Sequence, residues 1–377
     1  MLINQLNFSK EKVSVLIPVY RESGLLEELI TSILKDQYVN KEILVVIDEP
    51  TERSRRIAEK FRGRVRFVLN GERNGKVNAL REIVKLARGE VLLFLDSDVK
   101  IKAESFLSRI VEEMKNADIV ELKKNIVEDS FLAKLVKYDY IGFNSANWLF
   151  SRVLGKCLGI NGAAFAIKRS SYESIGGFEN VISEDLDLGL KTFIKGLKFK
   201  YLSDVEVFVQ IPSSWKWWIT QRKRWGIGAA FWLREHYKDL VKAVKKYPQV
   251  IIPSLVLIFP SLTPFIITLL TPEAIVFNFL STLLTLLAAR FNLFFLIFIP
   301  IPMPLIIAKN LLSLTSAFAT FSVIFYLIAR KLKYKYSFLE FLVYYFIYSP
   351  IWLLIMLTCV LMITTCPQVE INVDWKV

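Results

Sequence analysis

The chain has 377 residues, 53% of them hydrophobic, with a mean hydropathy of +0.39 and a formal net charge of +13. This composition is too apolar for a chain made only of ordinary soluble domains, and it excludes that class. Residues 1–249 hold 42 basic and 32 acidic side chains, so this first part of the chain reads as a basic globular region.

A basic region of this kind suits a partner rich in phosphate. The partner could be a sugar nucleotide, a lipid diphosphate, an anionic membrane surface or a nucleic acid, and charge alone does not choose among them. A solvated basic surface beside a membrane is the simpler alternative. Nucleic-acid binding has only the net charge in its favour, so we expect no nucleic-acid partner.

Histidine and cysteine are scarce. His236 is the only histidine, which excludes a histidine-rich metal site and a Ser-His-Asp triad. Cys157, Cys359 and Cys366 lack the paired spacing of a zinc site or a redox motif. Any bound metal must therefore have oxygen ligands, as Mg²⁺ and Mn²⁺ do.

The first elements of the chain alternate between strand and helix patterns. Residues 1–12 lack the basic-then-apolar pattern of a secretory signal, so we expect the following domain to stay in the cytosol. We predict strands at the short apolar runs 13–19, 43–47, 65–69 and 91–95. Amphipathic helices are predicted between them, near residues 24–36, 51–62 and 76–87. The alternation predicts an α/β fold with a mostly parallel, doubly wound sheet.

Polar side chains follow the predicted strands. Tyr20 and Glu22 follow the first, Asp48 the second, and Asp96 and Asp98 the fourth. Ligands of a doubly wound sheet bind beyond the carboxyl ends of its strands, so these acids lie where we expect a nucleotide. This is support from the fold alone and does not establish a function.

Asp96 and Asp98 stand one residue apart directly after an apolar strand. Two such carboxylates suit a divalent cation that bridges diphosphate oxygens and acts as a Lewis acid on the leaving group. The sequence Asn74-Gly75-Lys76 opens a predicted helix, which would offer backbone N–H groups, the helix dipole and a lysine charge to phosphate. Its simpler interpretation is an ordinary turn.

Glu184 and Asp185 begin a predicted helix after a glycine-containing loop. The helix dipole stabilises a carboxylate anion in the first turn, whereas partial burial beside a second acid raises the pKa. The simpler alternative is a set of acids that only complements the dipole, which explains one carboxylate more easily than the three at Glu184, Asp185 and Asp187.

Five of the eight tryptophans lie between residues 213 and 240. Tryptophan mixed with lysine and arginine just before an apolar run is typical of a helix in the membrane interface, and simple anchoring is the alternative to a role in chemistry. Gln221, Arg224 and Trp225 share one helix surface. Arg224 could grip a diphosphate there, and Trp225 could stack on a sugar ring.

Arg222 and Lys223 are expected to point elsewhere, towards lipid headgroups.

The last third of the chain is strongly apolar. Residues 250–329 contain only three charged side chains, and residues 338–365 contain only one, Glu340. A span needs about 20 apolar residues, so the first run could form three or four helices. The basic clusters on both sides of this run should face the cytosol, which favours an even number of crossings between them. With the second run, we predict four or five spans. A re-entrant or interfacial piece near Pro300 is the alternative.

In this order, Asp96-Ser97-Asp98, Glu184-Asp185 and the run from Gln221 to Trp225 resemble the D-x-D, E-D and Q-x-x-R-W series of the family 2 glycosyltransferases. That family includes cellulose, chitin and hyaluronan synthases and ceramide glucosyltransferase. The resemblance covers residues 13 to about 235, and the apolar part matches only in general character. It implies a GT-A type domain and a single displacement that inverts the anomeric carbon.

The resemblance also implies roles for the donor side. Asp98 would bind the metal, and Asp96 the nucleotide and the metal. Asp48 would contact the base or ribose, although Asp48-Glu49-Pro50-Thr51 departs from the usual Asp-Asp-Gly-Ser and leaves the role of Glu49 open. The nucleotide-sugar contacts would also include Pro18, Tyr20, Glu22, Asn74, Lys76, Gln221, Arg224 and Trp225.

On the acceptor side, Asp185 matches the acid assigned as the general base, and Glu184 would shape its site. Gly162 and Ala163 lie in a segment that resembles the lining of the acceptor terminus, and a packing turn explains the same small residues equally well. Trp225 would also contact the acceptor.

We therefore divide the chain into a cytosolic catalytic domain (1–212), an interfacial helix region (213–248), transmembrane helices (249–366) and a tail (367–377). We expect a multi-pass protein of the cell membrane, a metal-dependent inverting hexosyltransferase that uses Mn²⁺ or Mg²⁺. GDP-mannose is favoured over UDP-glucose as donor. The expected acceptor is a lipid-linked one, such as a dolichyl-linked oligosaccharide of N-glycan synthesis.

Two alternatives remain open. A processive or short-chain polysaccharide synthase would use the same motifs. From another class, a non-catalytic membrane scaffold or receptor could retain the fold, although the complete motif series argues against it. A transporter is poorly supported, because few charges interrupt the apolar runs.

Overall fold

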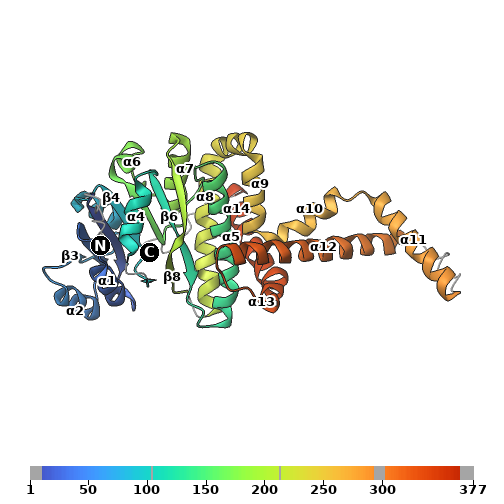
Figure 1. Cartoon of the computed structure of the whole chain (residues 1–377), viewed down its shortest axis with the longest axis horizontal. Helices are drawn as coiled ribbons and strands as arrows, with labels where there is room; N and C mark the ends of the chain where they lie inside the picture. Colours follow the sequence, from blue (N-terminus) through green and yellow to red (C-terminus); the bar gives the residue numbers. More distant parts are fainter. Residues whose placement is uncertain (1–10, 103–104, 212–213, 293–301, 366–377) are drawn as a thin grey trace, which may run out of the picture. The chain divides into compact units, whose positions relative to one another are not determined.

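The computed structural model describes residues 11–102, 105–211, 214–292 and 302–365. The chain forms two compact units (Figure 1). The first unit comprises Met1–Ser254 together with Leu354–Val377, and the second comprises Leu255–Leu353.

The first unit begins with the alternating elements that the sequence predicts. They are β1 (Val13–Tyr20), α1 (Leu26–Lys35), β2 (Lys41–Asp48), α2 (Glu52–Lys60), β3 (Arg66–Asn70), α3 (Lys76–Leu86) and β4 (Val91–Leu95). Strand β1 pairs in parallel with both β2 and β4, and β2 pairs in parallel with β3. The predicted doubly wound arrangement is therefore present in this half of the sheet, and its carboxyl ends gather at one edge.

The second half of the sheet is mixed. Its elements are β5 (Val99–Ile101), α4 (Phe106–Met114), β6 (Ile119–Ile126), α5 (Phe131–Val153), β7 (Ala164–Lys168), α6 (Arg169–Ser174), α7 (Glu184–Lys195) and β8 (Phe199–Val209). Strand β7 runs antiparallel to β4 and β6, whereas β6 and β8 are parallel. The eight strands lie in the order β3-β2-β1-β4-β7-β6-β8-β5. The reversal at β7 places the loop before it next to the end of β4.

A buried aromatic group supports this junction of β4 and β7. Phe94 stacks on Phe165 with ring centroids 4.9 Å apart, and Phe178 packs edge-on against Phe94 at 5.2 Å. All three rings are at least 98% buried and belong to one core cluster that includes Leu80 of α3 and Leu188 of α7. This cluster fixes α3 and α7 on the sheet, and both helices begin at the same edge.

Helix α8 (Trp215–Lys246) follows the sheet, and α9 (Pro248–Ile258) follows it. The side chain of Ser214 caps α8 by accepting a hydrogen bond from the N–H of Trp217. Trp218 is fully buried, whereas Trp217 is 65% exposed, so the tryptophan-rich stretch has an inner and an outer face. Ile227 and Ala230 of α8 pack against Cys359 and Ile363 in the last part of α14 (Ser349–Thr365).

The second unit contains only helices among its described residues. They are the end of α9, η1 (Pro260–Leu262), α10 (Thr263–Leu270), α11 (Glu273–Phe291), α12 (Pro302–Lys331), α13 (Phe338–Val343) and the π-helical turn η3 (Tyr344–Tyr348), with the start of α14. Phe318 of α12 contacts the rings of Phe341 and Tyr345.

Three stretches are long and apolar enough to cross a membrane: Glu273–Phe291, Ile306–Lys331 and Phe338–Thr365. The pair Pro248–Ile258 and Pro260–Leu270, bent by 103°, would make a fourth if it is one broken span. These helices fit a helical membrane region. The number of spans stays a prediction, and the tail and the predicted break at Pro300 lie outside the described residues.

Candidate active site

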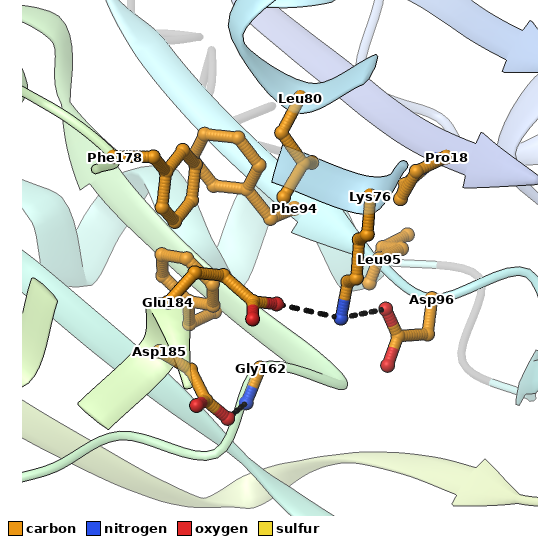
Figure 2. A pocket seen from close by; sticks show the side chains of 11 residues that line it. Pro18, Lys76, Leu80, Phe94, Leu95, Asp96, Gly162, Phe178, Glu184 and Asp185 are labelled. Carbon is orange, nitrogen blue, oxygen red and sulfur yellow. Dashed lines mark hydrogen bonds and ion pairs between the residues drawn. The ribbon is translucent and has the colours of Figure 1, made fainter. Parts of the chain in front are cut away.

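A pocket lies at the carboxyl ends of β1 and β4 (Figure 2). Its polar lining comes from the start of α3 (Lys76), the end of β4 (Asp96), the loop before β7 (Gly162) and the start of α7 (Glu184 and Asp185). The rest of its lining is apolar and comes from Pro18, Leu80, Phe94, Leu95, Phe165 and Phe178. Residues that the sequence places more than 100 positions apart therefore meet here, as the motif series predicts they should.

Lys76 bridges two acids in this pocket. Its Nζ lies 3.0 Å from Asp96 Oδ1 and 3.0 Å from Glu184 Oε1 (Figure 2). Burial alone would lower the pKa of Lys76, but the nearby carboxylates, led by Asp96, outweigh it and raise the pKa overall. The ammonium therefore stays charged, and it can neutralise two carboxylates or a phosphate that approaches them.

Asp48 holds the loop that presents Lys76. Its Oδ2 accepts hydrogen bonds from the backbone N–H groups of Asn74 and Gly75, both at 2.9 Å, and its Oδ1 accepts one from Asn70 Nδ2 at 2.9 Å. Gly75 has φ +87°, a conformation that side chains rarely adopt, so glycine is required there. In this structure Asp48 shapes the loop, and its contact with a nucleotide stays a prediction.

A second polar group surrounds Tyr20. The Tyr20 hydroxyl donates to Glu49 Oε2 at 3.2 Å, and the Arg73 guanidinium lies 4.1 Å from the centre of the Tyr20 ring. Glu49 has φ +48°, which is uncommon for a residue with a side chain and marks a constrained strand end. Glu22 accepts a hydrogen bond from the Thr51 hydroxyl at 2.6 Å. The sequence left Glu49 open and did not select Arg73, and their nearness to Tyr20 required the fold.

Asp96 and Asp98 have different surroundings. Asp96 is partly buried against Lys76, and its N–H donates to the carbonyl oxygen of Ala163 at 3.0 Å. Asp98 is exposed at its surface, but the surrounding protein atoms remove part of its hydration. This partial desolvation and the negative charge of Asp96 raise the pKa of Asp98 to about 7. The charges of Lys76 and Arg224 act in the opposite direction.

Asp96 and Asp98 could hold a divalent cation only if a substrate or water supplied further oxygen ligands. Across the described ranges, the structure has no group of three or more His, Cys, Asp or Glu residues that could hold a metal. Asp96 and Asp98 supply two hard oxygen donors whose repulsion a cation would relieve. Mg²⁺ commonly takes one or two carboxylates and completes its shell with substrate phosphates and water, so the donor set fits that mode of binding.

Asp185 is held between α7 and the loop that precedes β7. Its Oδ2 accepts a hydrogen bond from the N–H of Gly162 at 2.9 Å, and its Oδ1 accepts one from Leu186 at 2.8 Å. Burial and the neighbouring charge of Glu184 raise the pKa of Asp185 to about 6, while Lys76 and the two N–H groups partly oppose them. A carboxylate with this pKa is ionised at neutral pH and can accept a proton.

Close packing fixes the relation of Asp185 to this loop. A Cβ added to Gly162 would lie 3.2 Å from Asp185 Oδ2, and one added to Gly189 would lie 2.6 Å from Gly159 Cα. Helix α7 therefore lies against residues 159–162, with no room for a side chain at Gly189 and with room at Gly162 only if Asp185 shifts. The small residues in this segment, for which the sequence left a packing role open, do pack closely.

A buried ion pair beneath this loop was not predicted. Lys124 Nζ lies 2.6 Å from Glu121 Oε1, and both side chains are about 1% exposed. Glu121 Oε2 also accepts hydrogen bonds from Asn147 Nδ2 at 2.8 Å and from the N–H of Asn161 at 3.4 Å. The only signal in the sequence is charge within an otherwise apolar strand.

The residues of the Q-x-x-R-W motif lie on α8 and do not line the pocket itself. Arg224 is close enough to Asp98 to lower its pKa. The prediction for Arg222 is wrong: its side chain is fully buried and lies 2.8 Å from Asp139 Oδ2 of α5, so it cannot meet lipid headgroups. The cause is that Arg222 follows Trp218 by one helical turn and shares its buried face. Lys223 is exposed.

Two family models match the chain. The model described as glycosyl transferase family 2 matches residues 14–167, and the one described as glycosyl transferase family group 2 matches residues 91–366. The second match covers more than half of the sequence and includes the D-x-D, E-D and Q-x-x-R-W segments. The chain belongs to the family 2 glycosyltransferases.

Curated relatives of this glycosyltransferase include a poly-beta-1,6-N-acetyl-D-glucosamine synthase of Staphylococcus epidermidis, 24% identical over 255 residues, which cover 65% of this chain and 61% of the relative. A probable glycosyltransferase of Bacillus subtilis, YdaM, is 24% identical over 252 residues, which cover 62% of this chain and 59% of the relative. The chain thus spans about three fifths of the length of these relatives.

Among solved structures, the mannosyltransferase PcManGT from Pyrobaculum calidifontis, in complex with GDP-Man and Mn²⁺, is similar with a TM-score of 0.50 and 19% sequence identity. The similarity covers 81% of this chain and 88% of that one, and it concerns the fold. The predicted GT-A type domain followed by a helical membrane region is confirmed. The candidate spanning helices of this glycosyltransferase indicate a location in a membrane.

Proposed function

We propose that this glycosyltransferase moves a hexose from a nucleotide sugar to an acceptor held at a membrane, with inversion at the anomeric carbon. One observation carries the proposal: a single pocket contains a lysine between two acids and, beside them, a carboxylate with a pKa of about 6. The lysine and the acids that would bind a metal would stabilise the leaving group. The carboxylate with the raised pKa would act as the base for the attacking hydroxyl.

The donor side would be built from the ends of β1, β2 and β4. Lys76 and Arg224 supply positive charge for the diphosphate, and Asp96 and Asp98 are the residues that would hold Mn²⁺ or Mg²⁺. The cation would supply Lewis-acid stabilisation of the departing nucleoside diphosphate. Tyr20, which contacts Glu49 and Arg73, would bind the nucleoside that extends from that diphosphate.

The acceptor side would be built around Asp185. An acceptor hydroxyl gives its proton to Asp185 as its oxygen attacks the anomeric carbon from the face opposite the leaving group. One glycosidic bond forms, the bond from the anomeric carbon to the diphosphate oxygen breaks, and the electron pair leaves with the nucleoside diphosphate. Gly162 and Ala163 would line the path of the acceptor, and Trp225 would offer a ring face for a sugar.

We favour GDP-mannose as the donor and a lipid-linked acceptor, such as a dolichyl-linked oligosaccharide in N-glycan synthesis. Two observations support this choice: the chain has helices long and apolar enough to cross a membrane, and the similar mannosyltransferase structure holds GDP-Man with Mn²⁺. A polysaccharide synthase is the second candidate, because curated relatives are named poly-beta-1,6-N-acetyl-D-glucosamine synthases. A catalytic domain on the cytosolic side is part of the proposal.

A labelled-donor experiment tests this function. Detergent-solubilised protein with Mn²⁺ would receive radiolabelled GDP-mannose, UDP-glucose or UDP-N-acetylglucosamine, together with membrane lipid extract, and the label would be followed into organic solvent. We expect label in the lipid phase from GDP-mannose. Label only in an aqueous polymer would support the synthase instead, and no consumption or binding of any donor would overturn the enzymatic assignment and leave the scaffold.

A further inference from the structure

Arg222 and Asp139 form a buried ion pair between α8 and α5, which lie side by side in Figure 1. Arg222 Nη2 lies 2.8 Å from Asp139 Oδ2, and the side chains are 0% and 2% exposed. The free energy that it costs to take two opposite charges out of water can exceed what their attraction returns, so such a pair is weak evidence for stability. A buried pair can instead hold two helices in one geometry.

The Arg222 guanidinium also contacts two tryptophans of its own helix. It lies 4.4 Å from the centre of the Trp225 ring and 5.6 Å from the centre of the Trp218 ring. Trp218 is fully buried and Trp225 is partly buried. A planar guanidinium can lie against an aromatic face and hydrogen-bond a carboxylate at its edge at the same time, which a lysine ammonium cannot do.

This group of side chains adjoins the proposed donor site. Burial raises the pKa of Tyr140, next to Asp139 on α5, whereas the Arg222 charge lowers it and the Asp98 charge raises it. Arg224, two residues after Arg222, lowers the pKa of Asp98. The seam between α5 and α8 therefore lies within electrostatic reach of the D-x-D acids.

We propose that Asp139 and Arg222 are positioning residues for Trp225. The ion pair holds the guanidinium against one face of the indole, which fixes the ring and leaves only its opposite face for a sugar. The inference rests on the proposed function, in which Trp225 contacts the sugar or acceptor. It gives the second position of the Q-x-x-R-W motif in this chain a role that acts through the tryptophan.

A double-mutant cycle tests the inference. Arg222→Lys keeps the charge that Asp139 needs but removes the planar group, and Trp225→Ala removes the ring. Because small misplacements of substrate-positioning groups can cost about 100-fold, we expect Arg222→Lys to lower kcat/KM by about 10- to 100-fold while the Tm stays close to that of the wild type. In the Trp225→Ala background, Arg222→Lys should cause no further loss.

Further variants test the inference even if one of the proteins above does not fold. Asp139→Asn should lower kcat/KM as Arg222→Lys does, because the guanidinium loses its anchor. Should both fail to fold, the native pair can be kept: Trp225→Phe retains a ring for the guanidinium and should keep more activity than Trp225→Leu. Lys223→Gln, on the exposed side of α8, is the matched control and should leave kcat/KM unchanged.

The outcomes separate this inference from the proposed function. If Trp225→Ala leaves turnover unchanged, the role of Trp225 in the proposed function is wrong. If Trp225→Ala lowers kcat/KM but a folded Arg222→Lys does not, or if the two losses multiply, the positioning inference is wrong and the proposed function stands. Equal activity of Trp225→Phe and Trp225→Leu would also contradict the inference.

Discussion

The ammonium of Lys76 lies 3.0 Å from a carboxylate oxygen of Glu184. This contact joins the loop after β3, which the sequence associates with phosphate, to the acid that stands directly before Asp185. The same Lys76 atom lies 3.0 Å from Asp96, so the donor and base sides of the pocket share one charge. We therefore expect a substitution on either side of the pocket to shift the pKa of Asp185.

The pH dependence of transfer should report Asp185. Its pKa of about 6 results from burial and from Glu184, and the base is active only when ionised. The rate should therefore be constant above this pKa and fall by about tenfold per unit as pH decreases well below it. A profile of kcat against pH between 4 and 8 measures this, and a rate that rises towards acid would contradict the role as base.

Two substitutions beside Asp185 should move that acid limb in opposite directions. Glu184→Gln removes a negative charge that raises the pKa of Asp185, so the limb should move to lower pH. Lys76→Met removes a positive charge that lowers the same pKa, so the limb should move to higher pH. The position of the limb is compared, not the absolute rate, because Lys76 is also expected to bind phosphate. Shifts in the same direction would show that Asp185 is not the titrating group.

Asp98→Asn should weaken metal-dependent donor binding. A hydrogen bond or contact to a charged group is worth about 1.5–3 kcal/mol, so donor affinity in Mn²⁺ should fall by about 10- to 100-fold. Titration calorimetry with GDP-mannose or the accepted donor, with Mn²⁺ and with EDTA, measures the difference. Wild-type affinity in Mn²⁺ would exclude Asp98 as a metal ligand.

Gly228→Ala should impair catalysis through the segment before α7. An added Cβ would lie 2.3 Å from Ser183 Oγ and 2.8 Å from Ile182 Cγ2, so it would push the residues that lead into Glu184 and Asp185. We expect kcat to fall by about tenfold or more.

Gly226→Ala is the matched comparison on the same helix. Its added Cβ would meet Cys359 Sγ at 2.9 Å, away from Ser183. Both variants should lower the Tm, but only Gly228→Ala should lower kcat in the folded enzyme. An equal loss of kcat would show that general packing of α8 is responsible.

The first half of the sheet was predictable because its elements are locally consistent. Apolar runs such as Val91–Leu95 alternate with amphipathic helices, and strands β1, β2 and β4 are largely buried on both faces, whereas β3 at the edge of the sheet is partly exposed. Strand β6 was hidden because Glu121, Lys123 and Lys124 interrupt its apolar pattern. Those charges are tolerated in the core because Lys124 pairs with Glu121, and Lys123 pairs with Glu206 at 3.0 Å.

The sequence selected the residues that line the pocket, but it did not predict the buried contacts around them. Lys76, Asp96, Glu184 and Asp185 could be selected because each follows a strand or begins a helix, and the structure brings them into one pocket. The periodicity of α8 shows which residues share a surface but not which surface faces α5. Arg222 was misplaced for that reason.

Replacement of Asp185 by asparagine tests the central claim most directly. Asp185→Asn keeps the size of the side chain and removes its capacity to accept a proton, so kcat should fall by about 10²- to 10⁴-fold while the dissociation constant of the donor stays near the wild-type value. Turnover and donor binding would be measured on the same preparation. Unchanged turnover would contradict the account, because the pocket would then transfer sugar without the base assigned to it.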